Sequence, residues 1–186
     1  MVYRVQRDKM PDDLVHPQEI THPDRVLVLE QVERADYLGV THHQSTSWGP
    51  HCIKVARKAD RTRMLLQRNL KTAPKDVKTQ CYVSLVRPTL EYAATVWDPP
   101  NQTDANRLEK VQRRCARYVC NDFSRYSSVT EMLESLQWDT LAERRAKAKA
   151  VMMYRIRHDQ VDISLHDHFN QLTTRSRGNP DKFRVP

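Results

Sequence analysis

The sequence predicts a mainly α-helical protein, with a small N-terminal β-hairpin or meander followed by a bundle of about five helices. One observation behind this is that only three of the 186 residues are glycine, which leaves few positions for tight hairpins or phosphate-binding loops. The other is a change of period. Apolar residues alternate in short runs up to about residue 47, and beyond residue 48 they recur at the 3.6-residue period of an α-helix.

The expected strands cover residues 2–5, 25–32 and 36–40, and the prolines between them argue against helix. The expected helices cover residues 50–70, 74–97 and 103–120, then a short segment opening at Ser128, then a long one from about residue 140 to 158. We therefore expect three parts: a β element over 1–47, a helical domain over 48–169 and a flexible basic tail over 170–186.

The segment 74–97 has apolar residues around most of its circumference, so we expect it to be buried between other helices. Pro88 removes a backbone hydrogen bond and predicts a kink near Ser84. Arg87 and Glu91 have the spacing of facing neighbours. For the next helix, Asn101 or Thr103 is the expected N-cap.

The composition points to a polyanionic partner. Lys and Arg outnumber Asp and Glu by 31 to 23, which gives a formal charge of +8 and a pI near 9.5. Nucleic acid is the first candidate and an anionic membrane surface the second. No stretch reaches the roughly 18 apolar residues of a membrane span, and the first ten residues lack the apolar core of a secretory signal. We expect an intracellular protein, nuclear or cytoplasmic, that does not span a membrane.

Two helical faces carry the candidate binding residues. In the helix 50–70, a cationic stripe lies opposite the apolar positions, and the helix 103–120 repeats this arrangement. The candidates are Lys54, Arg57, Arg61 and Arg68 in the first helix and Lys110, Arg113 and Arg117 in the second. Such stripes can follow phosphates without reading bases, although a merely solvated face is the alternative. Arg63 lies on the packed side and needs a partner.

Neither the cysteines nor the tryptophans predict a site. The cysteine spacing differs from that of zinc knuckles, so we expect free, mostly buried thiols at Cys52, Cys81, Cys115 and Cys120. A metal cluster is conceivable around His42, His43, His51 and Cys52, but nothing downstream completes it. For Trp48, Trp97 and Trp138 packing is favoured over stacking on bases.

Several motifs occur in an order that resembles a known family. They are YLGV (37–40), W-x-x-H (48–51), KA (58–59), LVRPTLEYAATVWDP (85–99), LEKVQRRCARYV (108–119) and SVTEMLESLQWDTLAERR (128–145). The series is similar to the C-terminal part of reverse transcriptases from non-LTR retrotransposons of the jockey-like kind, and the similarity covers nearly the whole chain.

In that family the fingers and palm come first, and a YADD-type motif of the palm binds the two metal ions of nucleotidyl transfer. The resemblance implies that this chain begins after that motif. Its only adjacent carboxylates, Asp12 and Asp13, lack the preceding aromatic residue. We therefore expect a catalytically incomplete fragment without a cofactor, whereas the full-length enzyme would use Mg²⁺.

The resemblance also assigns roles to the parts present. Tyr37, Leu38 and Gly39 correspond to a primer grip, although packing on the first helix is the favoured role when the palm is missing. The helices correspond to the thumb, and the implied partner is an RNA or DNA template–primer duplex. A palm domain or another protein could dock on exposed apolar surface. The alternative function is a helical protein-interaction module, such as a host-adopted transposon remnant.

Overall fold

The computed structural model describes residues 32–163 in full, together with the backbone of six short strands outside that range. These strands form three antiparallel pairs: β1 (Tyr3–Val5) with β4 (Leu29–Gln31), β2 (Ile20–His22) with β3 (Arg25–Leu27), and β7 (Asn170–Gln171) with β8 (Phe183–Arg184). Asp12 and Asp13 lie outside the described residues, as does most of the expected flexible tail.

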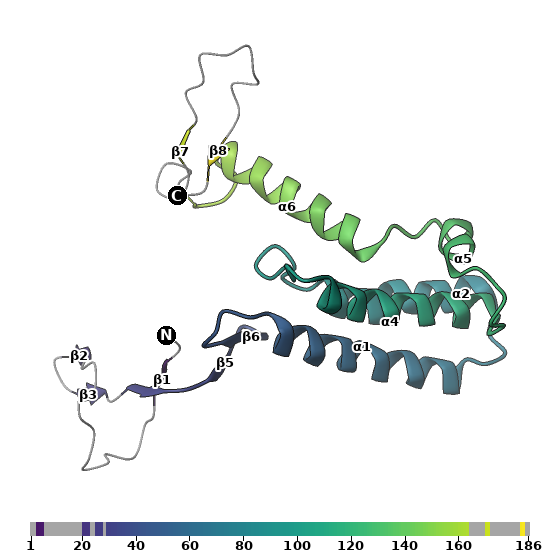
Figure 1. Ribbon diagram of the computed structural model, residues 1–186, viewed down its shortest axis with the longest axis horizontal. Coiled ribbons are helices and arrows are strands. Elements are labelled where there is room, and N and C mark those ends of the chain that lie inside the picture. Colours follow the sequence, from purple (N-terminus) through teal and green to yellow (C-terminus); the bar gives the residue numbers. More distant parts are fainter. Residues whose placement is uncertain are drawn as a thin grey trace. The chain divides into compact units, whose positions relative to one another are not determined.

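The chain divides into two compact units, Met1–Leu141 and Ala142–Pro186. The first contains the hairpin of β5 (Arg34–Tyr37) and β6 (Val40–His43), followed by α1 (Gly49–Asn69), α2 (Lys75–Cys81), η1 (Tyr82–Val86), α3 (Arg87–Glu91), α4 (Gln102–Cys120) and α5 (Val129–Ser135). The second contains most of α6 (Leu141–Arg157) (Figure 1). The expected mainly α fold with a β-hairpin is confirmed. The domain bounds expected at 47/48 and 169/170 stay predictions.

α1 and α4 lie side by side and run parallel (Figure 1). At their N-terminal ends, a Cβ added to Gly49 would lie 3.3 Å from the Asp104 carboxylate. Toward their C-terminal ends, the Tyr118 hydroxyl donates a 3.1 Å hydrogen bond to the carbonyl of Leu66. Two parallel helices need a connection that runs back along them, and the segment α2–η1–α3 supplies it while packing on α1.

The core of the first unit lies between α1, α4 and the segment α2–η1–α3. Its largest fully buried side chains include Trp97, Tyr82, Leu90 and Leu108. The apolar faces expected for the helices 50–70 and 103–120 are buried. Tyr82 stacks on Trp138 with ring centroids 3.9 Å apart. All three tryptophans thus pack in or against the core, as expected.

The helix expected over 74–97 is shorter and more irregular than its pattern indicates. Its middle, η1, is a π-helical turn in which the N–H of Arg87 donates to the carbonyl of Tyr82. Pro88 has no N–H to donate to the carbonyl four residues earlier, and the wider π turn accommodates this missing hydrogen bond. The helix ends at Glu91, because the Tyr92 carbonyl turns away to accept a 2.8 Å hydrogen bond from the Trp97 indole.

The expectation that this helix is buried over most of its circumference is wrong. Val77, Leu85 and Val96 are exposed, with 40, 52 and 59 per cent of their surface accessible. A single helical wheel fails here because the π turn changes the angular phase between the residues before and after it, and because Val96 lies beyond the helix end at Glu91. The Arg87–Glu91 pair does form, at 4.0 Å.

Side-chain caps confirm the predicted starts of two helices. The Asn101 side chain accepts a 2.8 Å hydrogen bond from the N–H of Asp104 at the start of α4. Ser128 accepts one of 3.3 Å from Glu131 at the start of α5. Each bond satisfies a donor that the first helical turn leaves open. Among the described helices, none combines the length and apolar character needed to cross a lipid bilayer.

Candidate nucleic-acid interface

The outer face of α1 carries three exposed arginines. Arg57, Arg61 and Arg68 are exposed, and none of them has an ion-pair partner within residues 32–163. At about 100° per residue they lie within roughly 40° of one another, opposite the buried Cys52 and Ala59. From Arg57 to Arg68 the stripe is about 16 Å long. It is therefore a narrow line of positive charge along one helix.

Lys54, the fourth predicted member of this stripe, is engaged in the fold. Its ammonium group donates to Asp36 at 2.8 Å and to the Thr41 hydroxyl at 3.1 Å. The Thr41 hydroxyl in turn donates to Asp36 at 2.5 Å. These bonds, from Lys54 first and Thr41 second, hold the pKa of the Asp36 carboxyl below its usual value. Lys54 therefore links the hairpin to α1, and its charge is paired with that of Asp36.

Of the three predicted cations on α4, two are exposed and one is hydrogen-bonded within the fold. Lys110 and Arg113 are exposed and have no ion-pair partner in the described part of the chain. Arg117 donates to the carbonyls of Ser124 and Ser127, at 2.6 and 3.4 Å, and so closes the loop after α4. Within the described residues, five of the seven predicted cations therefore have no such partner.

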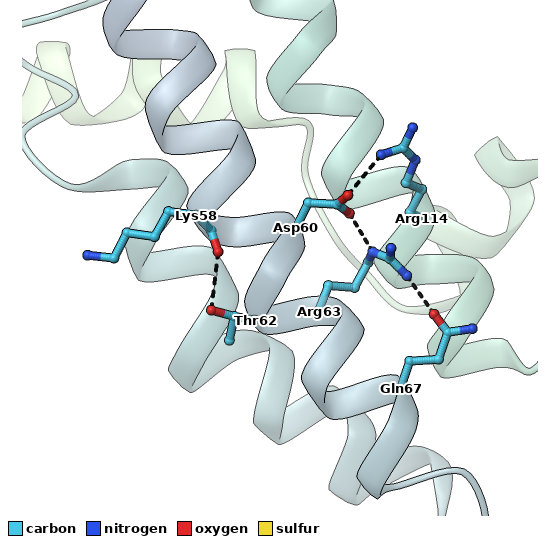
Figure 2. Close-up of polar contacts among 6 residues, drawn as sticks. All are labelled: Lys58, Asp60, Thr62, Arg63, Gln67 and Arg114. Atoms are coloured by element: carbon cyan, nitrogen blue, oxygen red, sulfur yellow. Dashed lines mark hydrogen bonds and ion pairs between the residues drawn. The ribbon is translucent and has the colours of Figure 1, made fainter.

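The structure brings one further cation between the two stripes. Arg114 of α4 donates to Asp60 of α1 at 3.2 Å, and Asp60 also accepts a 2.6 Å hydrogen bond from Arg63 (Figure 2). Arg63 thereby finds the partner that the sequence required, and it also donates to Gln67 at 2.6 Å. The Asp60–Arg63 spacing is visible in the sequence. The link to Arg114 is not, because it depends on how two helices pack.

The two stripes face the same side of the first unit. Asp60 lies on the side of α1 that faces α4, because it pairs with Arg114. Arg57 is rotated from Asp60 by about 60° around the axis of α1, toward the outer face. Arg114 lies on the side of α4 that faces α1. Lys110 is rotated from Arg114 by about 40° around the axis of α4, toward the outer face. Since the helices run parallel, their outer faces are continuous across the contact. We call this the α1–α4 cationic surface, made of Arg57, Arg61, Arg68, Lys110, Arg113 and Arg114.

The predicted primer-grip residues form the tip of the β5–β6 hairpin. Leu38 and Gly39 have φ angles of 47° and 81°, as a two-residue turn between twisted strands requires. Tyr37 and Leu38 are 68 and 72 per cent exposed, so their side chains do not pack on the first helix. The expected packing of the hairpin on that helix is made by the following strand, β6. Val40 and Thr41 are the buried residues of this hairpin.

Tyr92 contacts the tip of the hairpin. Its hydroxyl donates a 3.0 Å hydrogen bond to the Leu38 carbonyl, and its ring lies 3.4 Å from the position where a Cβ on Gly39 would stand. The motif YLGV is therefore linked through Tyr92 to the proline-containing segment. Sequence spacing gave no signal for this contact over 54 residues.

His51 is buried and structural. Its Nδ1 accepts a hydrogen bond from the N–H of Thr41, and its ring packs edge-on against Trp97 with centroids 4.6 Å apart. Burial lowers the pKa of His51, and the nearby positive charge of Lys54 lowers it further. In the part of the chain that is described, no three His, Cys, Asp or Glu side chains converge to hold a metal ion. The conceivable cluster around His42 is thus not assembled there.

The four cysteines are free thiols, as expected. Cys52 and Cys115 are buried, whereas Cys81 and Cys120 are partly accessible. Burial raises the pKa of Cys115 to about 12. A buried thiol with this pKa behaves as a small apolar side chain and is chemically inert.

Comparison with known proteins finds similarity to a transposon protein over part of the chain. No protein-family profile matches the chain, and no solved structure matches it. Over 121 residues the chain is 28 per cent identical to the probable RNA-directed DNA polymerase from transposon BS of Drosophila melanogaster. The match covers 63 per cent of this chain and 13 per cent of that relative. It confirms that the region is related to a transposon reverse transcriptase, as the motifs indicated.

Proposed function

We propose that this chain is a nucleic-acid-binding part of a protein related to transposon RNA-directed DNA polymerases. In this proposal, the α1–α4 cationic surface binds the sugar–phosphate backbone of a duplex without reading its sequence. The observation that carries the proposal is that two parallel, packed helices present exposed arginines and a lysine on one continuous side. The similarity to a polymerase adds support, since such enzymes act on a nucleic-acid duplex.

The physical basis is the match between charge and length. Arg57, Arg61 and Arg68 span about 16 Å, a length of duplex axis that carries roughly five phosphates on each strand. Long, flexible cations on a helix surface reach phosphates but offer no rigid array for base edges. We therefore expect binding through counterion release, with little difference between sequences.

We further propose that the chain contributes binding rather than chemistry. The resemblance implies magnesium for the full-length enzyme, but the described residues do not fit that ion, because no three potential ligands converge in them. Asp12 and Asp13 are the only adjacent carboxylates in the sequence. A primer-extension assay with the 186-residue chain, template–primer and Mg²⁺ tests this. We expect no incorporation, and incorporation would overturn this part of the proposal.

A salt titration tests the binding itself. Fluorescence anisotropy of a labelled 20-base-pair duplex, titrated with the full chain between 50 and 200 mM KCl, gives the dependence of affinity on salt. If about five phosphates are neutralised, the logarithmic slope is about −4.5 and affinity falls roughly 500-fold over that range. Two unrelated sequences should give the same curve. A salt-independent affinity, or no binding at 50 mM KCl, would refute the proposal.

A further inference from the structure

Asp60 is held between two guanidinium groups that come from different helices. Its Oδ1 accepts a 2.6 Å hydrogen bond from Nε of Arg63 on the same helix, and its Oδ2 accepts one of 3.2 Å from Arg114 on α4 (Figure 2). Figure 2 also shows Lys58 pointing away from this cluster, on the opposite side of α1. Asp60 is thus an acidic group at the centre of a cationic surface.

The two ion pairs differ in their surroundings. The Arg63 side chain is only 11 per cent exposed and is fixed further by its bond to Gln67. The Arg114 side chain is 56 per cent exposed, and among the described residues it donates to Asp60. An exposed pair of this kind contributes about 0–1 kcal/mol and is weakened by salt. The bond to Arg63 is therefore the durable one, and the bond to Arg114 is the one that can open.

Opening that bond leaves no isolated buried charge. Asp60 keeps its short hydrogen bond to Arg63, so its carboxylate stays compensated when Arg114 departs. Arg114 lies about 40° from Lys110 and one helical turn further along α4. The Arg114 side chain can therefore reach a phosphate that is bound near Lys110.

We propose that Arg114 is a further phosphate-binding residue of the α1–α4 cationic surface and that Asp60 is its internal competitor. In the free protein Asp60 holds Arg114; when a backbone phosphate binds, Arg114 turns to it and Arg63 alone neutralises Asp60. This inference rests on the proposed binding function. It adds an autoinhibitory acid to that function, which limits the affinity of the surface.

A double-mutant cycle with Asp60→Asn and Arg114→Gln tests the inference. Asparagine keeps an oxygen that accepts from Arg63, but it no longer attracts Arg114 as an anion. In the anisotropy assay at 100 mM KCl, we expect D60N to strengthen duplex binding by roughly two- to eightfold and to steepen the salt slope by up to about 0.9. Adding R114Q to D60N should remove most of this gain. R114Q should therefore weaken binding more in the D60N background than in the wild type.

Arg113→Gln is the matched control, since Arg113 lies next to Arg114 on α4 and has no acidic partner among the described residues. R113Q should weaken binding by the same factor with and without D60N. Thermal denaturation checks that each variant is folded, and Asp60→Ser replaces D60N if that variant unfolds. If the wild type binds but R114Q has equal effects in both backgrounds, only this inference is overturned. If the wild type does not bind, the proposed function is overturned as well.

Discussion

The backbone N–H of Thr41 donates a 3.1 Å hydrogen bond to Nδ1 of His51, and this bond joins the β-hairpin to the first helix. Because Nδ1 accepts, the ring proton of the neutral imidazole resides on Nε2. That Nε2 is buried and has no hydrogen-bond partner in the described structure. Protonating Nδ1 would remove the acceptor and place a charge against Trp97. This bond can therefore hold the hairpin only while His51 is neutral.

This anchor predicts a loss of stability in mild acid. The folded-state pKa of His51 lies below the ordinary value of 6.5, chiefly because of burial. The unfolded chain therefore takes up this proton first as the pH falls, and the stabilisation is present above pH 6.5 and lost below it. Thermal denaturation at pH 8, 7, 6 and 5 should show a decreasing melting temperature below pH 6.5. Asp36, with its lowered pKa, adds its own loss only below about pH 4.

His51→Asn isolates this contribution. Asparagine can accept from Thr41 but does not titrate, so the variant should show a flatter pH profile. It lacks the ring that packs against Trp97, so it should be less stable at pH 8 by about 2 kcal/mol. His158→Asn, at an exposed position, is the control and should retain the wild-type profile. The account of His51 is wrong if H51N and the wild type lose stability in parallel between pH 7 and 5.

The hairpin turn predicts a stabilising substitution. Leu38 has a φ of 47° and is exposed, so its side chain gains little from packing and sits in a conformation that leucine disfavours. Asparagine followed by glycine is the preferred pair for such a turn. We expect Leu38→Asn to raise the free energy of unfolding by about 0.5–1 kcal/mol in urea denaturation.

Gly39→Ala should act in the opposite direction. Its φ of 81° is unfavourable for alanine, and the new methyl group would touch Tyr92. We expect a decrease of about 1–2 kcal/mol in the free energy of unfolding. Equal effects of G39A and L38N would contradict the turn geometry, since one variant relieves strain and the other adds it.

The burial of Cys115 predicts selective thiol chemistry. Burial raises the pKa of Cys115 to about 12, so this thiol is protonated at pH 8 and is a poor nucleophile. Iodoacetamide should first modify Cys81 and Cys120, which are partly accessible. Mass spectrometry of tryptic peptides after short labelling measures this. Modification of Cys115 at the rate of Cys120 in native protein would show that α4 does not pack as described.

The sequence predicts the regular helices of this protein well, because their faces follow one period throughout. The apolar positions of α1 and α4 are buried, and the caps at Asn101 and Ser128 form as expected. The segment around Pro88 escapes prediction, because a π turn changes the angular phase and a side-chain bond from Trp97 to the Tyr92 carbonyl favours an early end. Local pattern contains neither effect.

The candidate site divides in the same way. Exposed cations on one helix face follow from the period, so Arg57, Arg61, Arg68 and Lys110 were found from sequence. Whether a cation is already engaged depends on a partner elsewhere in the chain. Lys54 bonds to Asp36, 18 residues away, and Arg114 bonds to Asp60 over 54 residues. Such pairs require the packing of separate elements, which a single sequence does not reveal.

The most direct test of the proposed binding surface compares two triple variants of the full chain with equal charge. R57Q/R61Q/R68Q removes the stripe on α1, whereas R34Q/K75Q/R125Q removes three exposed cations outside α1 and α4. The measurement is the salt dependence of duplex binding by anisotropy. We expect the first variant to flatten the logarithmic slope by about 2.7 and the second to leave it close to the wild type. Equal slopes for the two variants would contradict a binding surface on these helices.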